Sequence, residues 1–290
     1  MNFTKLQGAG NDFVLVEADK VWRDWPKLAI AMCHRHFGIG GDGLLLLLPS
    51  DKADLHMRVF NPDGSEAEAC GNGLRCLVRY ALDKGLADRK KSEISVETIA
   101  GIRKAKLHTE GNKTIIQTSM GEPKFSAKDI PIVLEPGTHF SPAKPIMDYP
   151  VTVDGRKLAL SFVAIGNPHA VYFGQQPVVD FPLSQLGPKV EQHPIFPNRV
   201  NFEVARVLSP KQIEGRVWER GVGETLSCGS GACAIAVSAR LHGYTDSKVD
   251  IKLPGGILGV EWDGTGEVFL SGTAEIVFSG EWTDENIATD

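Results

Sequence analysis

Two cysteines stand in the same local sequence, and their surroundings indicate chemistry. Cys70 and Cys228 each begin a Cys-Gly-x-Gly motif, C-G-N-G at 70–73 and C-G-S-G at 228–231. Each motif follows a predicted strand and a loop of glycine and acidic residues, and each precedes a stretch with helical spacing. A cysteine at the start of a helix faces unpaired N–H groups and the positive end of the helix dipole, which stabilise a thiolate. The sequence therefore predicts two thiols that ionise near neutral pH.

The two motifs belong to an internal repeat. Residues 58–73 align with residues 216–231 without a gap, and A-G-N-D-F-V-L at 9–15 matches I-G-N-P-H-A-V at 165–171. Identical residues in the longer repeat include the pairs Arg58 and Arg216, Glu66 and Glu224, Cys70 and Cys228, and Gly73 and Gly231. Self-similarity of this kind predicts two halves of one plan. Such halves usually pack about a pseudo-two-fold axis, which would bring both cysteines to one ligand.

Two thiols on opposite sides of a carbon can invert it. A thiolate removes the proton while a thiol supplies another, and identical groups let the reaction run in both directions. A pair of core cysteines, a disulfide and a redox dithiol are the alternatives, although neither Cys70–Cys76 nor Cys228–Cys233 has C-x-x-C spacing. Cys33, Cys76 and Cys233 lack the glycine motif and are expected to be buried, small and apolar.

Strands must position these motifs in both halves. The alternation of apolar and polar residues predicts short strands, with one helix before and one after the first cysteine. In the first half we expect strands at 3–7, 13–18, 44–48, 55–60, 94–98, 103–107 and 114–118, and helices at 25–36 and 74–82. In the second half we expect strands at 158–164, 170–173, 202–207 and 215–218, a helix at 232–241 and further strands through 278. Prolines make 122–150 the most linker-like stretch.

Length and composition exclude several classes of protein. At 290 residues two domains are the default, because single cores stop growing at about 250–300 residues. A net charge of −5 provides no field for nucleic acid. The longest apolar run, Leu44–Leu48, is far too short to span a membrane, and the first residues lack a secretory signal. We therefore expect a cytoplasmic protein with five reduced cysteines. Cys33, His34 and His36 do not share a helix face, so no metal site is predicted.

Five motifs together resemble the diaminopimelate epimerase family, whose members invert one α-carbon of diaminopimelate in lysine biosynthesis without pyridoxal phosphate. They are G-A-G-N-D-F at 8–13, H-F-G-I-G-G-D-G at 36–43, N-P-D-G-S-E-A-E-A-C-G-N-G-L-R-C at 61–76, G-N-P-H at 166–169 and E-R-G-V-G-E-T-L-S-C-G-S-G-A-C-A at 219–234. The resemblance runs nearly end to end. It implies an α+β fold of two pseudo-symmetric, strand-rich half-barrel domains, each around a central helix, with the active site in the cleft between them.

The resemblance also sets the expected organisation. Residues 1–122 would form the first domain, 123–274 the second, and a last strand at about 275–290 would return to the first. The expected substrates are LL- and meso-diaminopimelate, with no cofactor and no metal. A homodimer is expected on the resemblance alone.

Site residues carried over by motif position fall into three groups. Cys70 and Cys228 would be the acid/base pair, and His169 and Glu219 would tune the two thiols. Backbone N–H groups of Gly71, Asn72, Gly229 and Ser230 would hold the reacting carboxylate. The remaining amino and carboxyl groups of the substrate would contact Asn11, Asn61, Asn167, Asn201, Glu219 and Arg220.

One position departs from the family pattern. Some members have glutamine where Gly43 stands, so a ligand contact made by that side chain is missing here. A racemase of another amino acid with the same thiols, or a thiol redox or thiol-ligand-binding protein, remains an alternative.

Overall fold

The computed structural model describes residues 1–18, 23–67, 70–110, 113–134 and 144–283. The chain divides into two compact units, Met1–Ser119 with Ser271–Asp290, and Met120–Leu270. Among the described residues, no helix has the length and apolar character needed to cross a membrane.

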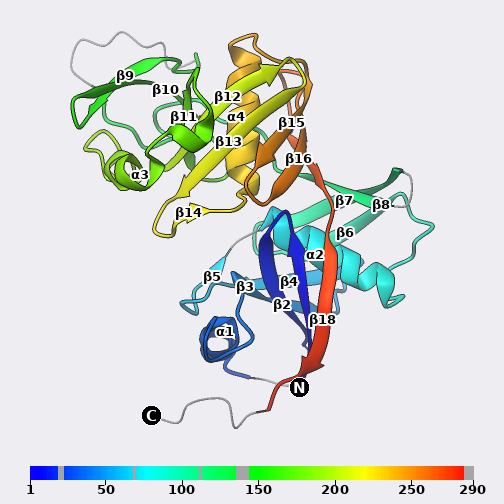
Figure 1. Ribbon diagram of the computed structural model, residues 1–290. Helices are drawn as coiled ribbons and strands as arrows, with labels where there is room; N and C mark the ends of the chain where they lie inside the picture. Colours follow the sequence, from blue (N-terminus) through cyan, green and yellow to red (C-terminus); the bar gives the residue numbers. More distant parts are fainter. Residues whose placement is uncertain (19–22, 68–69, 111–112, 135–143, 284–290) are drawn as a thin grey trace. The chain divides into compact units, whose positions relative to one another are not determined.

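The first unit is a curved sheet around one helix (Figure 1). Its strands are β1 (Asn2–Gly8), β2 (Asn11–Glu17), β3 (Gly43–Leu48), β4 (Leu55–Phe60), β5 (Glu66–Ala67), β6 (Glu93–Thr98), β7 (Gly101–Glu110), β8 (Lys113–Ser119) and β18 (Glu275–Glu281), and its helices are α1 (Trp25–Cys33) and α2 (Gly71–Asp83). Helix α2 contacts β1, β2, β3, β4, β8 and β18. Its buried side chains join those of the strands in one apolar core, and α1 packs against β2, β3 and β4 in a second cluster. Strand β18 pairs antiparallel with β1, so the end of the chain belongs to this unit.

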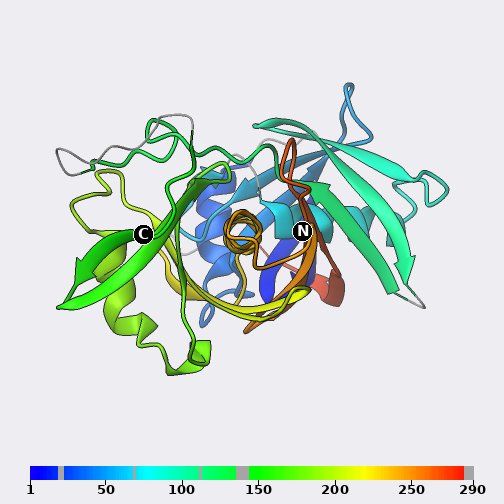
Figure 2. The same cartoon turned by 90° about the horizontal axis from the view of Figure 1, so that it is seen from above.

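The second unit has the same plan. Its strands are β9 (Tyr149–Val153), β10 (Arg156–Ala164), β11 (Pro168–Phe173), β12 (Asn201–Ser209), β13 (Gln212–Glu219), β14 (Gly223–Thr225), β15 (Lys248–Leu253) and β16 (Gly256–Glu261), followed by β17 (Phe269–Gly272), on which the chain leaves the unit; its helices are η1 (Val178–Asp180), α3 (Leu183–Glu191) and α4 (Gly229–Leu241). Helix α4 contacts β10, β11, β12, β13, β15 and β16. Viewed nearly along α4, these strands curve around the helix (Figure 2).

Strand pairing shows that the two units are structural repeats. In the first unit β2–β3 is parallel, β3–β4 antiparallel, β4–β6 parallel and β6–β7 antiparallel. In the second, β11–β12, β12–β13, β13–β15 and β15–β16 follow the same order of directions. The α+β fold of two strand-rich halves, each around a central helix, is therefore confirmed.

The aligned sequence repeat occupies equivalent hairpins. Phe60 pairs with Glu66 in β4–β5, and Trp218 pairs with Glu224 in β13–β14. The Arg58 guanidinium holds the Glu66 carboxylate through Nε at 2.6 Å and Nη2 at 3.0 Å. Arg216 holds Glu224 in the same way, at 2.7 Å and 3.0 Å. A bidentate pair fixes the geometry of a hairpin better than a single contact, so each half uses it to hold the loop that leads to its cysteine.

Helix boundaries differ from the sequence expectation: α2 and α4 each begin three residues earlier than expected, at Gly71 and Gly229, and α1 ends early. Helix α1 begins as expected, with the Asp24 side chain accepting the Lys27 N–H at 3.2 Å, but it ends at Cys33 rather than at residue 36. His34 has extended backbone, and its Nδ1 accepts the N–H groups of His36 and Phe37 at 3.2 and 3.0 Å. A side chain that bonds the following backbone competes with the helix, and this explains the early end.

Helix α3 was not expected, because Gly187 and Pro188 interrupt its pattern. The glycine is required by packing, since a Cβ there would lie 2.5 Å from Cδ2 of Trp218. The proline-rich stretch before β9 is likewise packed in its described part, where Ile130, Ile132 and Ile146 are buried in the core of the second unit. The described part of this stretch is therefore not a free linker, and residues 135–143 lie outside the described residues.

Candidate active site

Cys70 lies at the N-cap of α2. Its backbone is extended (φ −143°, ψ 112°), and its Sγ accepts the N–H of Gly73 at 3.3 Å. The side chain is half-buried. Because the first N–H groups of a helix have no partner within it, Gly71 and Asn72 present donors beside this sulfur. The sulfur and these donors together suit a negative charge.

Cys228 occupies the equivalent N-cap of α4, with φ −126° and ψ 117°. Both helices run for 13 residues. The Cys228 thiol donates to Oε2 of Glu219 at 3.2 Å and lies 3.5 Å from the Ser230 hydroxyl. Thr225 donates its hydroxyl to the other Glu219 oxygen at 2.6 Å, so this carboxylate is held in place.

The expectation that both thiols ionise near neutral pH is wrong for Cys228. Burial raises the pKa of the Cys228 thiol well above its ordinary value, and the nearby Glu219 carboxylate raises it further. The hydroxyl of Ser230 and the N–H of Gly231 favour the thiolate but do not outweigh burial. The helix start is present as predicted, but desolvation penalises the charged form more than the helix stabilises it. Cys228 is therefore a protonated thiol.

The other three cysteines are core residues. Cys33, Cys76 and Cys233 are buried, and burial raises the pKa of Cys33 and Cys76 to about 12. All five cysteines lie in described residues, and none of them forms a disulfide bond. The prediction that these three are small apolar core side chains is confirmed.

Asn11 and Asn72 form one chain of amides beside Cys70. Asn72 Nδ2 donates to Asn11 Oδ1 at 3.0 Å, and Asn11 Nδ2 donates to Asp42 at 2.7 Å. Arg75, which is fully buried, donates to Asn72 Oδ1 at 2.5 Å. Side-chain amides held at both ends have a fixed orientation. The structure therefore brings Asn11, Asn72 and Cys70 together in the first unit.

A charge network lies behind this chain. Arg35 donates to Asp12 at 2.8 Å and to Asp42 at 2.6 Å, and buried Lys5 bonds both Asp12 and the Gly40 carbonyl. Burial would raise the pKa of Asp12, but hydrogen bonds from Arg35 and Lys5 outweigh it, and the pKa is lowered. These ion pairs and hydrogen bonds anchor the loop that orients Asn11.

Asn61 is used within its own turn. Its backbone N–H bonds the Ser65 carbonyl at 2.8 Å, and its Nδ2 donates to the Ser65 hydroxyl at 2.9 Å. The structure thus shows Asn61 shaping the turn between β4 and β5. A substrate contact by this side chain stays a prediction.

His169 and Asn167 lie together in the second unit. His169 Nε2 is 2.9 Å from Asn167 Oδ1, and Nδ1 is 2.6 Å from Oε1 of Glu203. Both His169 and Glu203 have no exposed surface. Glu203 could not be recognised as a site residue from the sequence, because a single glutamate in a predicted strand ordinarily faces solvent.

Asn201, the first residue of β12, contacts Arg220. Asn201 Oδ1 accepts the backbone N–H of Arg220 at 2.7 Å, while its buried Nδ2 has no hydrogen-bond partner among the described residues. The Arg220 side chain is exposed and donates to the Asn198 carbonyl at 3.1 Å. A buried amide donor without a protein partner is suited to a ligand oxygen, and an exposed guanidinium can hold a carboxylate.

Glu191 is a second residue that the sequence did not reveal. It lies on α3 and accepts Trp218 Nε1 at 2.8 Å and the N–H of Gly221 at 3.0 Å. Both bonds hold the turn after Glu219 and Arg220. Glu191 could not be recognised from the sequence because the helix that carries it, α3, was not predicted.

Gly43 begins β3, opposite Phe13. A Cβ at this position would lie 3.0 Å from the Phe60 carbonyl oxygen and 3.4 Å from the Phe13 ring. The backbone therefore closes around the glycine, and a glutamine side chain would require it to open.

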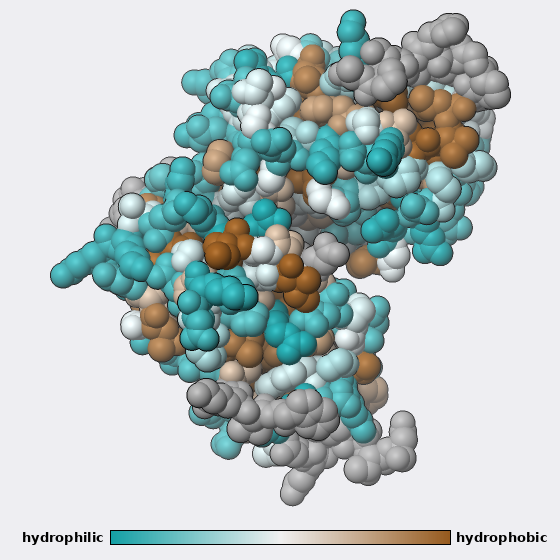
Figure 3. Space-filling model, turned by 180° about the vertical axis from the view of Figure 1, so that it is seen from behind, coloured by the Kyte–Doolittle hydropathy of each residue, from teal (hydrophilic) through white to brown (hydrophobic). Residues whose placement is uncertain are grey.

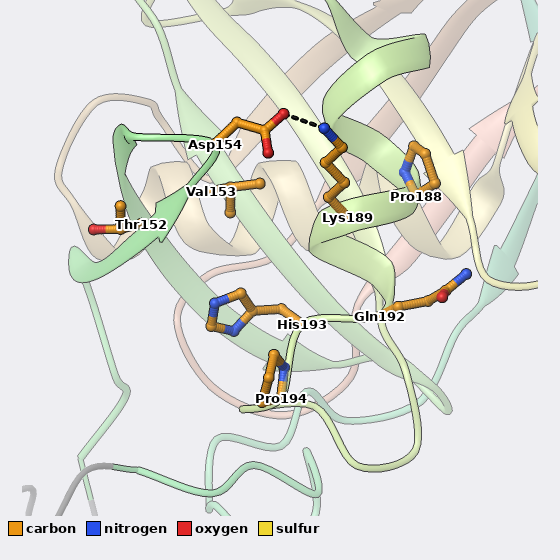
Figure 4. A pocket seen from close by; sticks show the side chains of 8 residues that line it. All are labelled: Thr152, Val153, Asp154, Pro188, Lys189, Gln192, His193 and Pro194. Atoms are coloured by element: carbon orange, nitrogen blue, oxygen red, sulfur yellow. Dashed lines mark hydrogen bonds and ion pairs between the residues drawn. The ribbon is translucent and has the colours of Figure 1, made fainter.

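A surface hollow of about 540 Å³ lies apart from this chemistry in the second unit (Figure 4). It is lined by Thr152, Val153, Asp154, Pro188, Lys189, Gln192, His193 and Pro194. Lys189 and Asp154 form an ion pair across it. No residue of the cysteine motifs lines the hollow.

The sequence matches the family model described as diaminopimelate epimerase over residues 3–126 and 161–277. The chain belongs to the diaminopimelate epimerase family. It is 46% identical to the diaminopimelate epimerase of Pelotomaculum thermopropionicum over 286 residues, which cover 97% of this chain and 99% of the relative. It is 46% identical to that of Moorella thermoacetica, with the same coverage.

Solved structures share the fold at low identity. A phenazine biosynthesis protein of the PhzF family from Bacillus anthracis matches with a TM-score of 0.71 at 18% identity, covering 98% of this chain and 99% of that chain. A probable proline racemase from Agrobacterium radiobacter matches with a TM-score of 0.70 at 14% identity, covering 98% and 93%. The family resemblance expected from the motifs is thus confirmed, and so is the fold that it implied.

Proposed function

We propose that this chain interconverts LL- and meso-diaminopimelate by cofactor-independent inversion of one α-carbon, with Cys70 and Cys228 as the acid/base pair. Membership of the epimerase family makes the chain an isomerase. The observation that carries the mechanism is the equivalent placement of the two thiols. Each is the N-cap of a 13-residue helix at the centre of one structural repeat.

The two sulfurs differ in their surroundings, and this gives each a starting role. Cys228 is protonated, because burial and Glu219 both raise its pKa. Cys70 accepts an N–H from Gly73, a donor that stabilises a thiolate better than a thiol. In the proposed cycle the Cys70 thiolate therefore removes the α-proton and the Cys228 thiol delivers a proton to the opposite side. In the reverse direction the roles exchange: after one proton has moved from Cys228 to Cys70, the Cys228 thiolate removes the α-proton and the Cys70 thiol delivers one to the opposite side.

Removing an α-proton leaves negative charge on the substrate. Backbone N–H groups of Gly71, Asn72, Gly229 and Ser230 open two helices, where the dipoles favour an anion. We assign the reacting carboxylate to these donors, since stabilisation of developing charge is commonly a large part of catalysis. Arg220 would take a carboxylate, with Asn11, Asn61, Asn167 and Asn201 as further contacts and His169 and Glu219 tuning the thiols.

Solvent-isotope exchange tests the function. In D₂O with reductant, the purified chain should place deuterium at the α-carbon of diaminopimelate and interconvert its isomers. Cys70→Ala and Cys228→Ala should each lower inversion by at least about 10²-fold, the usual range for a lost acid or base. Cys76→Ala and Cys233→Ala are matched controls, because these buried thiols lie on the same two helices, and their rates should stay near that of the wild type.

The outcomes separate the alternatives. Exchange on another amino acid but not on diaminopimelate would favour a racemase of different specificity. A chain that exchanges no α-proton but cycles a disulfide between Cys70 and Cys228 would be a redox protein. Full activity in either alanine variant would remove that cysteine from its role.

A homodimer is part of the proposal. Every residue of β18 is exposed, including Ile276, Val277 and Phe278, which are 36–57% exposed. Elsewhere, on the face drawn in Figure 3, hydrophilic residues predominate and apolar residues form separate patches. An exposed apolar strand suits a second copy. Light scattering should give about twice the 31.4 kDa chain mass, and Val277→Glu should give a monomer. We also propose a cytoplasmic location, because both thiols must stay reduced.

A further inference from the structure

Glu203 is a buried acid that the proposed mechanism does not yet use. Its side chain has no exposed surface, and Oε2 has no hydrogen-bond partner among the described residues. Burial of a carboxyl group is costly unless a partner offsets the cost. The residue lies in β12, two positions after Asn201, so both side chains lie on the same face of the strand. A buried acid in this place needs an explanation.

His169 supplies the partner. It pairs in register with Asn201 across β11 and β12, and its Nδ1 is 2.6 Å from Glu203 Oε1. Its other ring nitrogen, Nε2, is 2.9 Å from Asn167 Oδ1. An amide oxygen can only accept, so Nε2 must carry a proton. The contact between Nδ1 and Glu203 Oε1 holds one more proton, which is bound to one of these two atoms.

The pair is neutral overall in either arrangement. Burial raises the pKa of Glu203, the histidine opposes this shift and Glu219 adds to it. The ionisable groups that face the pair from other elements are Glu219 at the end of β13 and Cys228 at the N-cap of α4. Each becomes negatively charged when it ionises, and a negative charge nearby favours retention of the proton shared by His169 and Glu203.

Glu203 also touches the helix that carries Cys228. A Cβ on Gly231 would lie 3.1 Å from Glu203 Oε1, so the carboxyl group packs directly against the first turn of α4. One side chain thus contacts both the imidazole and the cysteine helix. Glu203 at Nδ1 and Asn167 at Nε2 together hold the His169 ring in one orientation.

We propose that Glu203 is a positioning residue that, together with Asn167, holds the His169 ring in one orientation with a proton on Nε2. The inference rests on the proposed function, in which His169 tunes a thiol. The two tuning residues thus differ in their contacts, since Glu219 accepts a hydrogen bond from the Cys228 thiol while His169 donates one to Asn167. The Nε2 donor in turn fixes the Asn167 amide, which the proposed function places against the substrate.

Nitrogen NMR of the ¹⁵N-labelled full chain tests the inference without using activity. The chain has 8 histidines, and the His169→Gln variant identifies the signals of His169. In the wild type Nε2 should remain protonated from pH 6 to 8.5. In Glu203→Gln the shared proton is lost, so the ring should pass through a single titration step in this range. Glu191→Gln is the matched control, a buried glutamate that contacts Trp218 and Gly221, and it should leave the His169 signals unchanged.

An unprotonated Nε2 in the wild type, or the same titration in Glu203→Gln as in the wild type, would overturn the inference. If Glu203→Gln does not fold, the protonation of His169 Nε2 in the wild-type spectrum still tests the inference. In the exchange assay Glu203→Gln should displace the pH profile of kcat/KM and lower it about tenfold or more at neutral pH, against about 10²–10⁴ for a group that transfers the proton itself. A uniform loss at every pH would mean a merely structural role. If the wild type exchanges no α-proton, the proposed function fails while the NMR result still stands.

Discussion

Replacing Gly231 with alanine tests whether the close approach of α4 to the sheet positions Cys228. The added Cβ would lie 3.1 Å from Glu203 Oε1 and 3.1 and 3.2 Å from the two methyl groups of Val217, closer than ordinary contact. Val217 is buried, is stiff because it is β-branched, and lies on a strand paired on both sides. Glu203 is held by His169. The first turn of α4 must therefore shift by a few tenths of an ångström.

Two terms oppose each other in the stability of Gly231→Ala. Overpacking a core costs about 1–3 kcal/mol, while alanine gains up to about 1 kcal/mol over glycine within a helix. The net destabilisation should be about 0–3 kcal/mol. A displacement of about 1 Å at a reacting group can cost about 10²-fold in rate, so a few tenths should lower the exchange rate about 4- to 10-fold. Activity should thus fall by more than stability alone explains.

The assay combines urea unfolding with α-deuterium exchange. The double variant Gly231→Ala/Val217→Ala makes room for the new methyl group, so its loss of stability should be smaller than the sum of the single losses by about 1 kcal/mol or more. The exchange rate should recover in part. Additive losses, together with a wild-type rate in Gly231→Ala, would refute the reasoning that this contact places the sulfur.

Two further predictions concern charge. Glu219→Gln removes the anion beside Cys228 and should lower the pKa of this thiol, although burial continues to raise it. Alkylation of Cys228 at fixed pH should therefore become faster, while epimerisation becomes slower. An unchanged alkylation rate would show that Glu219 does not act on the sulfur. Hydrogen bonds from Lys91 and Ser95 lower the pKa of Asp54 to about 2. The contribution of Asp54 to stability is therefore complete above about pH 4 and is lost as the pH falls toward 2. Asp54→Asn should flatten the fall of the unfolding free energy between pH 4 and 2, and the same fall as in the wild type would contradict this.

The sequence pattern alone predicts the secondary-structure elements that depend on residues close together in the chain. The strand at Leu55–Phe60 was predicted with its observed bounds, because alternating burial is visible in the sequence. Both cysteines were placed at helix starts, since glycine and a following apolar period mark a helix boundary. Helix α3 was missed because its glycine fits the Trp218 ring, a residue 31 positions away in the sequence.

The amino-acid sequence by itself determined the repeat, the α+β class, the family and the two thiols, because these depend on residue types at short and regular spacing. Only the tertiary structure decided how each thiol is charged and held. The high pKa of Cys228 comes from burial and from Glu219, and the state of His169 comes from Glu203 on a neighbouring strand. Electrostatic energies depend on distances and on exclusion of water, and the folded strands set both.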